Sequence, residues 1–173
     1  MAALGVGVVI VALLWILVQA EPGDSTSADS PLLGRPAPAV LSTTTDDQPF
    51  DLGRRKGSWV LLNFFNSTCV PCVREHPELV EFHARQVGSP DPVELYTVIW
   101  DDREASVEAW FEVNGGDWPR VRDPDGAVGV AFGVARVPES WIIDPNGFVR
   151  LRILGEVTAD FLDERLLGLR TPS

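Results

Sequence analysis

The two cysteines of the chain, Cys69 and Cys72, lie two residues apart in the segment NSTCVPCVRE (66–75). They directly follow the apolar run VLLNFF (60–65), which predicts a buried strand, and they begin a stretch with the apolar spacing of a helix. Such a pair can serve as a structural disulfide, as part of a metal site or as a catalytic dithiol. The chemistry of the chain depends on which of these it is.

A structural disulfide would close a loop of only four residues, which stabilises a fold by about 2 kcal/mol. The chain is 45% hydrophobic and can bury a core without this bond. In a metal site, Cys69, Cys72 and His76 could supply three ligands, because His76 shares a helix face with Cys72. A fourth ligand is missing, since the other histidine, His83, lies seven residues further along the predicted helix and is expected at the surface. We therefore expect no bound metal.

A catalytic dithiol fits the position of the pair at the start of a helix. Unpaired N–H groups and the positive end of the helix dipole stabilise a thiolate there. Cys69 would be the exposed nucleophile, and Cys72, within the first turn, could resolve a mixed disulfide. Pro71 is compatible with the first turn, where N–H groups lack helical partners. The spacing therefore favours thiol–disulfide exchange.

A second candidate feature is the dipeptide Val137-Pro138, which precedes the predicted strand SWIID (140–144). Only about 5 to 6% of X-Pro bonds in folded proteins are cis, so a trans proline at a strand start is the alternative. If the bond is cis, Pro138 can face the cysteines and present the backbone of Val137 to an extended client peptide.

Strands and helices alternate along the chain from residue 58 onward. The predicted strands are 58–65, 93–100, 118–123, 140–144 and 148–154, the last two forming a hairpin. The predicted helices are 71–86, 104–114, 127–132 and 158–169, the last with Thr158 or Asp160 near its N-cap. This order predicts an α/β layer fold with a mixed sheet.

The first twenty residues carry no charged side chain. The apolar run 2–18 would span about 26 Å as a helix, close to a hydrocarbon core of roughly 30 Å. We expect residues 1–20 to be a membrane anchor, with a secretory signal cleaved after Ala20 as the alternative. Glu21 and Asp24 follow this segment where a cytoplasmic flank would carry Lys or Arg, which places the remaining chain on the extracytoplasmic side of the membrane, or outside the cell if the segment is cleaved.

Residues 21–31 are rich in Gly, Pro, Ser and acids, which predicts a flexible linker before a folded domain over 32–173. The net charge of the chain is -11. Nucleic acids and anionic lipid surfaces require a basic patch on their partner, so neither is expected to bind this domain.

Three segments resemble the thioredoxin-like thiol-disulfide oxidoreductases of the TlpA, ResA and CcmG (DsbE) type. They are LLGRPAPAV (32–40), WVLLNFFNSTCVPCVREHPEL (59–79) and FGVARVPESWIIDPNGFVRLRILG (132–155). The resemblance covers nearly everything from Leu33 to the end. It implies a thioredoxin-like fold, a mixed central sheet flanked by helices, with an N-terminal β-hairpin and an inserted βα unit between the CxxC helix and the cis-proline.

The resemblance also implies a function. The family consists of exported or membrane-tethered bacterial enzymes, mostly reductants, and some reduce apocytochrome c so that haem can attach. Expected partners are protein thiols and disulfides, such as apocytochrome c, and an upstream electron donor in the membrane. No cofactor is expected.

The resemblance assigns the nucleophile to Cys69, the resolving thiol to Cys72 and the cis-proline to Pro138. It places Glu75 where some members have a carboxylate that raises thiol pKa values or relays protons. The alternative for Glu75 is a solvated acid that favours the helix dipole. The family usually has Trp before the first cysteine, whereas Thr68 leaves this surface open and offers a hydroxyl. Together with Val137, it is a candidate for substrate binding.

Two other functions fit parts of the pattern. A peroxiredoxin-like peroxidase shares the fold and the opening GRPAP, but its P-x-x-x-[ST]-x-x-C pocket is absent, since Asn66 and Cys69 stand three residues before the two cysteines. A copper-handling thiol protein normally requires a further histidine ligand distant in sequence, and no histidine follows His83. The sequence therefore predicts an enzyme that exchanges disulfides with protein clients, and it leaves the client and the direction of electron flow open.

Overall fold

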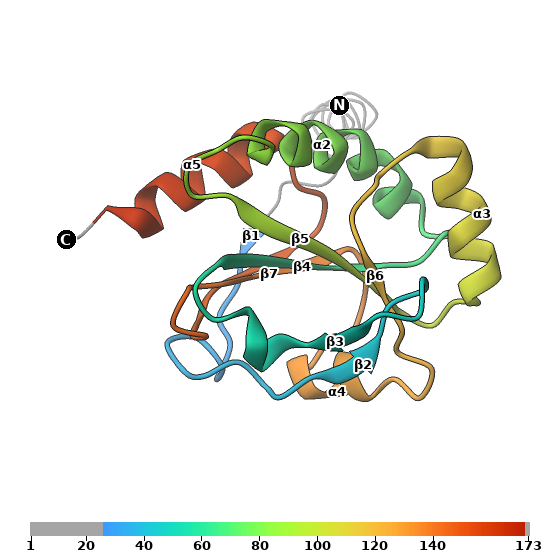
Figure 1. Cartoon of the computed structure of the whole chain (residues 1–173), viewed down its shortest axis with the longest axis horizontal. Coiled ribbons are helices and arrows are strands. Elements are labelled where there is room, and N and C mark those ends of the chain that lie inside the picture. The colour runs from blue at the N-terminus through green and yellow to red at the C-terminus, as the bar shows by residue number, and fades with distance from the viewer. Residues whose placement is uncertain (1–25, 172–173) are drawn as a thin grey trace, which may run out of the picture.

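A six-stranded mixed sheet lies at the centre of the computed structural model, which describes residues 26–171 (Figure 1). The strand order is β1-β8-β7-β4-β5-β6, and β2 pairs with β3 in a separate hairpin. The strands are β1 (Thr26–Ser27), β2 (Leu41–Thr43), β3 (Pro49–Asp51), β4 (Trp59–Phe65), β5 (Val93–Ile99), β6 (Arg120–Val121), β7 (Glu139–Ile143) and β8 (Val149–Leu154). The helices are η1 (Leu52–Arg55, 3-10), α2 (Val70–Gln86), α3 (Glu104–Asn114), α4 (Ala127–Phe132) and α5 (Ala159–Arg170).

The direction of the strands divides the sheet into two parts. β4, β5 and β6 run parallel, whereas β7 is antiparallel to β4 and β8 is antiparallel to β7. Crossover connections that contain α2 and α3 join the parallel strands, as parallel pairing requires. The predicted α/β layer fold with a mixed sheet is therefore confirmed.

Side chains of the central strand β4 alternate between two buried layers. Leu61 and Phe65 belong to the core under α2, α3 and α5, while Leu62 and Phe64 belong to the core on the opposite face. Figure 1 shows α2, α5 and α3 on one face and α4 with the β2–β3 hairpin on the other. Because both faces are covered, β4 is buried along its whole length, as its continuous apolar run predicts.

Two parts of the architecture match the resemblance. β2 and β3 form the expected N-terminal hairpin. Between β5 and α4 the chain adds α3 and the short strand β6, which supply the expected insertion before the cis-proline. At the C-terminal end, Thr158 is the N-cap of α5, and its side chain accepts a hydrogen bond from the N–H of Phe161.

The N-terminal part of the described chain differs from expectation. We predicted a flexible linker over 21–31, but Thr26 and Ser27 form β1, which pairs with β8 at the edge of the sheet. The N–H of Ala28 continues this pairing by donating to the carbonyl of Arg152. The prediction does not hold for residues 26–28, because backbone hydrogen bonds can dock a segment whose side chains have no apolar pattern.

The predicted anchor or signal segment, residues 1–20, lies outside the described residues. Between residues 26 and 171, no helix is both long and apolar enough to span a bilayer.

Candidate active site

The end of β4 and the start of α2 hold the two cysteines. Cys69 is the N-cap residue of α2, and it forms a disulfide with Cys72 in the first turn. Cys69 is partly exposed, whereas Cys72 has no exposed surface. The N–H of Cys72 donates to the sulfur of Cys69 at 3.2 Å. The helix start therefore places a donor against Cys69, the sulfur that a second molecule can reach.

The Val137-Pro138 bond is cis, which confirms the prediction. The carbonyl oxygen of Val137 lies 3.6 Å from the sulfur of Cys69, although 68 residues separate them in sequence. Pro138 is buried and Val137 is half-buried. The structure thus brings the two predicted parts of the site together, and the role of Val137 in client binding stays a prediction.

Thr68 is exposed beside Cys69, but its hydroxyl is not free. Both its N–H and its Oγ1 donate to Oδ1 of Asn66, at 2.8 and 2.7 Å. The Nδ2 group of Asn66 in turn donates to the carbonyl oxygens of Trp100 and Asp101, at 3.2 and 2.8 Å. Asn66 therefore fastens the loop before Cys69 to the end of β5. We did not single it out as a structural residue, and its position directly after a buried strand was the available signal.

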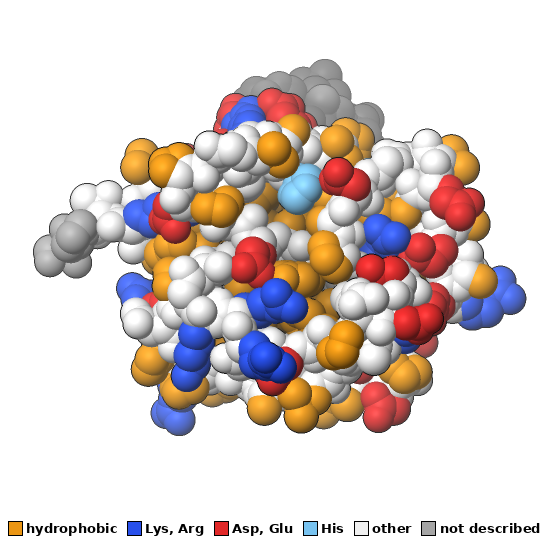
Figure 2. Space-filling view, viewed as in Figure 1, with side chains coloured by type: hydrophobic (Ala, Val, Ile, Leu, Met, Phe, Trp, Pro, Cys, Tyr) orange, Lys and Arg blue, Asp and Glu red, His pale blue; other side chains and the backbone are white. Residues whose placement is uncertain are grey.

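An open cavity of about 930 Å³ begins beside this loop. Its lining includes Thr68 and Trp100 together with the acidic side chains of Asp101, Asp123 and Asp125. Acidic side chains also gather around α3 on the face seen in Figure 2. The surface near Cys69 is therefore hollowed on the side of Thr68, where the family usually carries a bulky indole.

Glu75 is buried under the sheet, with 1% of its surface exposed. Its Oε1 accepts a hydrogen bond from Nδ2 of Asn63 at 2.8 Å, and its Oε2 accepts one from the N–H of Val157 at 3.0 Å. Burial raises the pKa of this carboxyl to about 8, although both hydrogen bonds oppose the rise. The alternative of a solvated first-turn acid is wrong. A carboxyl that titrates near neutral pH lies one helical turn from Cys72.

Asn63 and Ser140 complete a buried polar cluster that sequence reasoning missed. Neither has exposed surface, and Nδ2 of Asn63 donates to Oγ of Ser140 at 3.1 Å. Asn63 on β4 and Ser140 on β7 are cross-strand partners. The available signal was the single amide within the apolar run of β4, because a buried polar side chain requires a partner.

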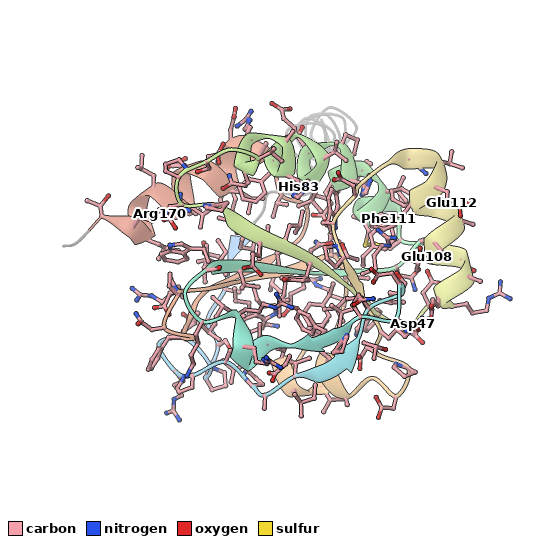
Figure 3. The ribbon with its side chains drawn as sticks, viewed as in Figure 1. Asp47, His83, Glu108, Phe111, Glu112 and Arg170 are labelled. Atoms are coloured by element: carbon pink, nitrogen blue, oxygen red, sulfur yellow. A yellow bond between two sulfur atoms is a disulfide. The ribbon has the colours of Figure 1, made fainter. Side chains whose placement is uncertain are left out.

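His76 faces α3 and not the cysteines. Its Nε2 lies 2.9 Å from the carbonyl oxygen of Gly115, and its ring packs against Trp110 and Phe111. Burial lowers the pKa of this imidazole. His83, labelled in Figure 3, is partly exposed and reaches the surface, as expected. Over residues 26–171, no three His, Cys, Asp or Glu side chains are arranged to hold a metal ion.

Comparison with known proteins gives consistent results. The family model for Redoxin matches residues 32–165 of this chain. Thiol:disulfide interchange protein HelX of Rhodobacter capsulatus is 32% identical over 149 residues, which cover 84% of this chain and 81% of HelX. Thiol:disulfide interchange protein DsbE of Escherichia coli is 31% identical over 167 residues, covering 91% of this chain and 85% of that protein.

Solved structures show the same fold. StoA from Bacillus subtilis superimposes with a TM-score of 0.64 at 25% identity, covering 73% of this chain and 95% of StoA. The thioredoxin domain of a thiol-disulfide oxidoreductase from Bacteroides vulgatus has a TM-score of 0.70 at 23% identity, covering 82% of this chain and all of that domain. The thioredoxin-like fold is therefore confirmed, with the cysteine pair at the start of its first long helix.

Proposed function

From the premise that the chain belongs to the Redoxin family and is a thiol-disulfide oxidoreductase, we propose that it reduces disulfides of client proteins outside the cytoplasm. The observation that carries thiol-disulfide exchange is the asymmetry of the cysteine pair, and the direction, reduction of the client, rests on the resemblance to enzymes that are mostly reductants. Cys69 is accessible at the start of α2 and lies 3.6 Å from the carbonyl of Val137, whereas Cys72 is enclosed. A client can therefore react with one sulfur while the other is held back for the second step.

In the first step, the thiolate of Cys69 attacks one sulfur of the client disulfide. The client S–S bond breaks, a Cys69–client disulfide forms, and the second client sulfur leaves as a thiolate that takes a proton from water. The N–H of Cys72, which donates to the sulfur of Cys69, supports the negative charge before the attack.

In the second step, Cys72 loses its proton and attacks the sulfur of Cys69. The Cys69–Cys72 disulfide forms and the remaining client sulfur leaves as a thiolate, so the client has gained two electrons and the protein has lost two. We assign Glu75 the role of accepting the proton from Cys72. Its pKa of about 8 is close to the ordinary value of a thiol, about 8.5, which allows the transfer at little cost.

Client binding is assigned to the backbone at Val137 and to the open surface at Thr68. A carbonyl next to Cys69 can accept a hydrogen bond from an extended client segment, which holds the segment without reading its side chains. The cavity beside Thr68 gives room for residues that precede or follow the client cysteine. This arrangement suits several clients and not one small molecule.

Apocytochrome c is the client class that we propose, with electrons supplied in turn by a donor in the membrane. Support comes from the resemblance to enzymes of cytochrome c maturation and from residues 1–20, whose apolar run is suited to an anchor. The redox domain would then lie on the extracytoplasmic side, at a cell membrane where haem attachment takes place.

The experiment uses the full-length chain with its cysteines reduced and excess reductant removed. It is mixed with a synthetic CxxCH peptide that carries an intramolecular disulfide, and peptide thiols are counted by mass spectrometry after alkylation. We expect one peptide disulfide to be reduced for each Cys69–Cys72 disulfide formed, and we expect no reduction by Cys69→Ser. A wild-type protein that keeps its own thiols while the peptide disulfide stays intact would contradict the proposed function.

A further inference from the structure

The polar cluster of Asn63, Glu75 and Ser140 lies in an otherwise apolar layer between the sheet and α2. The three side chains are 0, 1 and 0% exposed, so water does not satisfy their polar atoms. Asn63 and Ser140 project from paired positions of β4 and β7 toward the helix that carries Glu75. Every hydrogen bond of the cluster must therefore come from the protein.

The observed bonds fit an ionised Glu75. Both of its oxygens accept, Oε1 from Nδ2 of Asn63 and Oε2 from the N–H of Val157. The second hydrogen of Nδ2 is used by Ser140. Oδ1 of Asn63 is buried and has no hydrogen-bond partner among residues 26–171. Both hydrogen-bond partners of Glu75 are donors in this arrangement, so neither can accept a proton carried by Glu75.

A neutral Glu75 needs such an acceptor, because a protonated carboxyl must donate one hydrogen bond. Oε2 faces the N–H of Val157, so the proton belongs on Oε1, which faces Asn63. Here it would meet the hydrogens of Nδ2. With a pKa of about 8, the neutral form is present at neutral pH, so the cluster must rearrange when Glu75 gains its proton.

We propose that the side-chain amide of Asn63 turns over when Glu75 takes up a proton, so that Oδ1 replaces Nδ2 opposite Glu75 and Ser140. Oδ1 has two lone pairs and can accept both the carboxyl O–H and the hydroxyl of Ser140. The opposite end of the amide has no partner in the present orientation, and after the turn the two hydrogens of Nδ2 take the place of Oδ1 there. The hydrogen bonds to Glu75 and Ser140 therefore decide the orientation.

Asn63 and Ser140 become positioning residues for the proton step. If the N–H group of Asn63 stayed opposite Glu75, it would stabilise only the carboxylate form. An amide that turns over can form a hydrogen bond with either the carboxylate or the protonated carboxyl of the buried Glu75. This inference rests on the proposed function in one respect, that the proton comes from Cys72. The rearrangement itself requires only that Glu75 titrates.

Few other titratable groups act on the cluster. The charge of Glu156, next to Val157, raises the pKa of Glu75 further. On the α2 side, Cys72 does not titrate while it is in the disulfide. β4 and β7 present the amide of Asn63 and the hydroxyl of Ser140 on this face, and neither titrates. The oxidised protein is therefore the suitable state for the measurement.

The test is a nuclear magnetic resonance titration of the oxidised full-length chain between pH 6 and pH 10. The carboxyl carbon of Glu75 reports its proton, and the side-chain amide of Asn63 reports its orientation through contacts of its hydrogens with the β-hydrogens of Ser140. We expect these contacts above the midpoint of Glu75 and their loss below it, with one shared midpoint. Amide signals that keep the same contacts while Glu75 titrates would overturn the proposal.

The variant Glu75→Gln separates the rearrangement from a pH effect that arises elsewhere in the protein. Nothing titrates at this position in the variant, so the pH-dependent change of the Asn63 amide should disappear; its persistence would contradict the proposal. The titration needs no client, so a protein that fails to reduce the CxxCH peptide but shows the coupled titration refutes the proposed function and not the rearrangement.

Discussion

Replacing Glu75 by Gln should remove a large pH dependence from the stability of the oxidised protein. The pKa of this carboxyl is about 8 in the folded state, against an ordinary value of 4.5. Between these values the folded protein binds more protons than the unfolded chain, so the free energy of unfolding falls as pH rises. The stabilising effect of the neutral form is complete below pH 4.5 and is lost as pH rises through 8. Gln has no proton to lose, so the variant lacks this contribution.

The size of the effect follows from the separation of the two pKa values. Each pH unit between the two pKa values lowers the free energy of unfolding by about 1.4 kcal/mol, and the decrease is smaller close to either pKa. From pH 5 to pH 8 the loss is about 3 to 4 kcal/mol. This is a large part of the roughly 5 to 15 kcal/mol that stabilises an ordinary domain.

The assay is urea unfolding of the oxidised wild type and of Glu75→Gln at pH 5, 6, 7 and 8, with disulfides kept intact. Other titrating groups are common to both proteins, so the difference in free energy of unfolding isolates Glu75. We expect this difference to shift in favour of the variant by about 3 to 4 kcal/mol across the series. A difference that stays constant with pH would refute the reasoning, because Glu75 would then have the same pKa in both states.

Three further substitutions test other parts of the structure. Arg152→Met leaves the fully buried Glu139 without the guanidinium that binds it at 2.9 and 3.2 Å. This variant should lower the free energy of unfolding in urea by about 3 to 5 kcal/mol, and Arg152→Lys, which keeps the charge, should lower it by less. Thr158→Ala removes the N-cap of α5 and should cost about 1 kcal/mol in the same assay, whereas Thr158→Ser should cost little. Asn66→Ala removes the hydrogen bonds that hold the loop before Cys69 and should lower the free energy of unfolding by about 1 to 3 kcal/mol. The kcat/KM of this variant should fall more for the CxxCH peptide than for a small disulfide. Equal falls for both substrates would contradict a role of this loop in client binding.

The cysteine site could be predicted from the sequence because its parts are close together. The apolar run of β4, the CxxC spacing and the apolar periodicity of α2 all lie within 59–86, so local rules were sufficient. The position of Pro138 against Cys69 came from family resemblance. Its physical basis is the pairing of β4 with β7, which residue spacing alone does not indicate.

Features that depend on distant pairing could not be predicted. The partners of Glu75 come from β4 and from the N–H of Val157, 82 residues away, so nothing near Glu75 indicated that it would be buried. The docking of residues 26–28 on β8 uses backbone groups that every sequence has. β6 covers only Arg120–Val121 of the predicted strand 118–123, and Trp118 before it lies in the core and donates from Nε1 to Oγ1 of Thr97.

The central claim is that Cys69 attacks the client and Cys72 resolves the mixed disulfide. Trapping with the reduced Cys72→Ser variant tests it most directly: the variant is mixed with the CxxCH peptide disulfide, quenched with acid and mapped by mass spectrometry. We expect a stable peptide adduct on Cys69, while Cys69→Ser as the matched control accumulates little adduct on the buried Cys72. A control that forms the adduct on Cys72 faster than Cys72→Ser forms it on Cys69 would contradict the account.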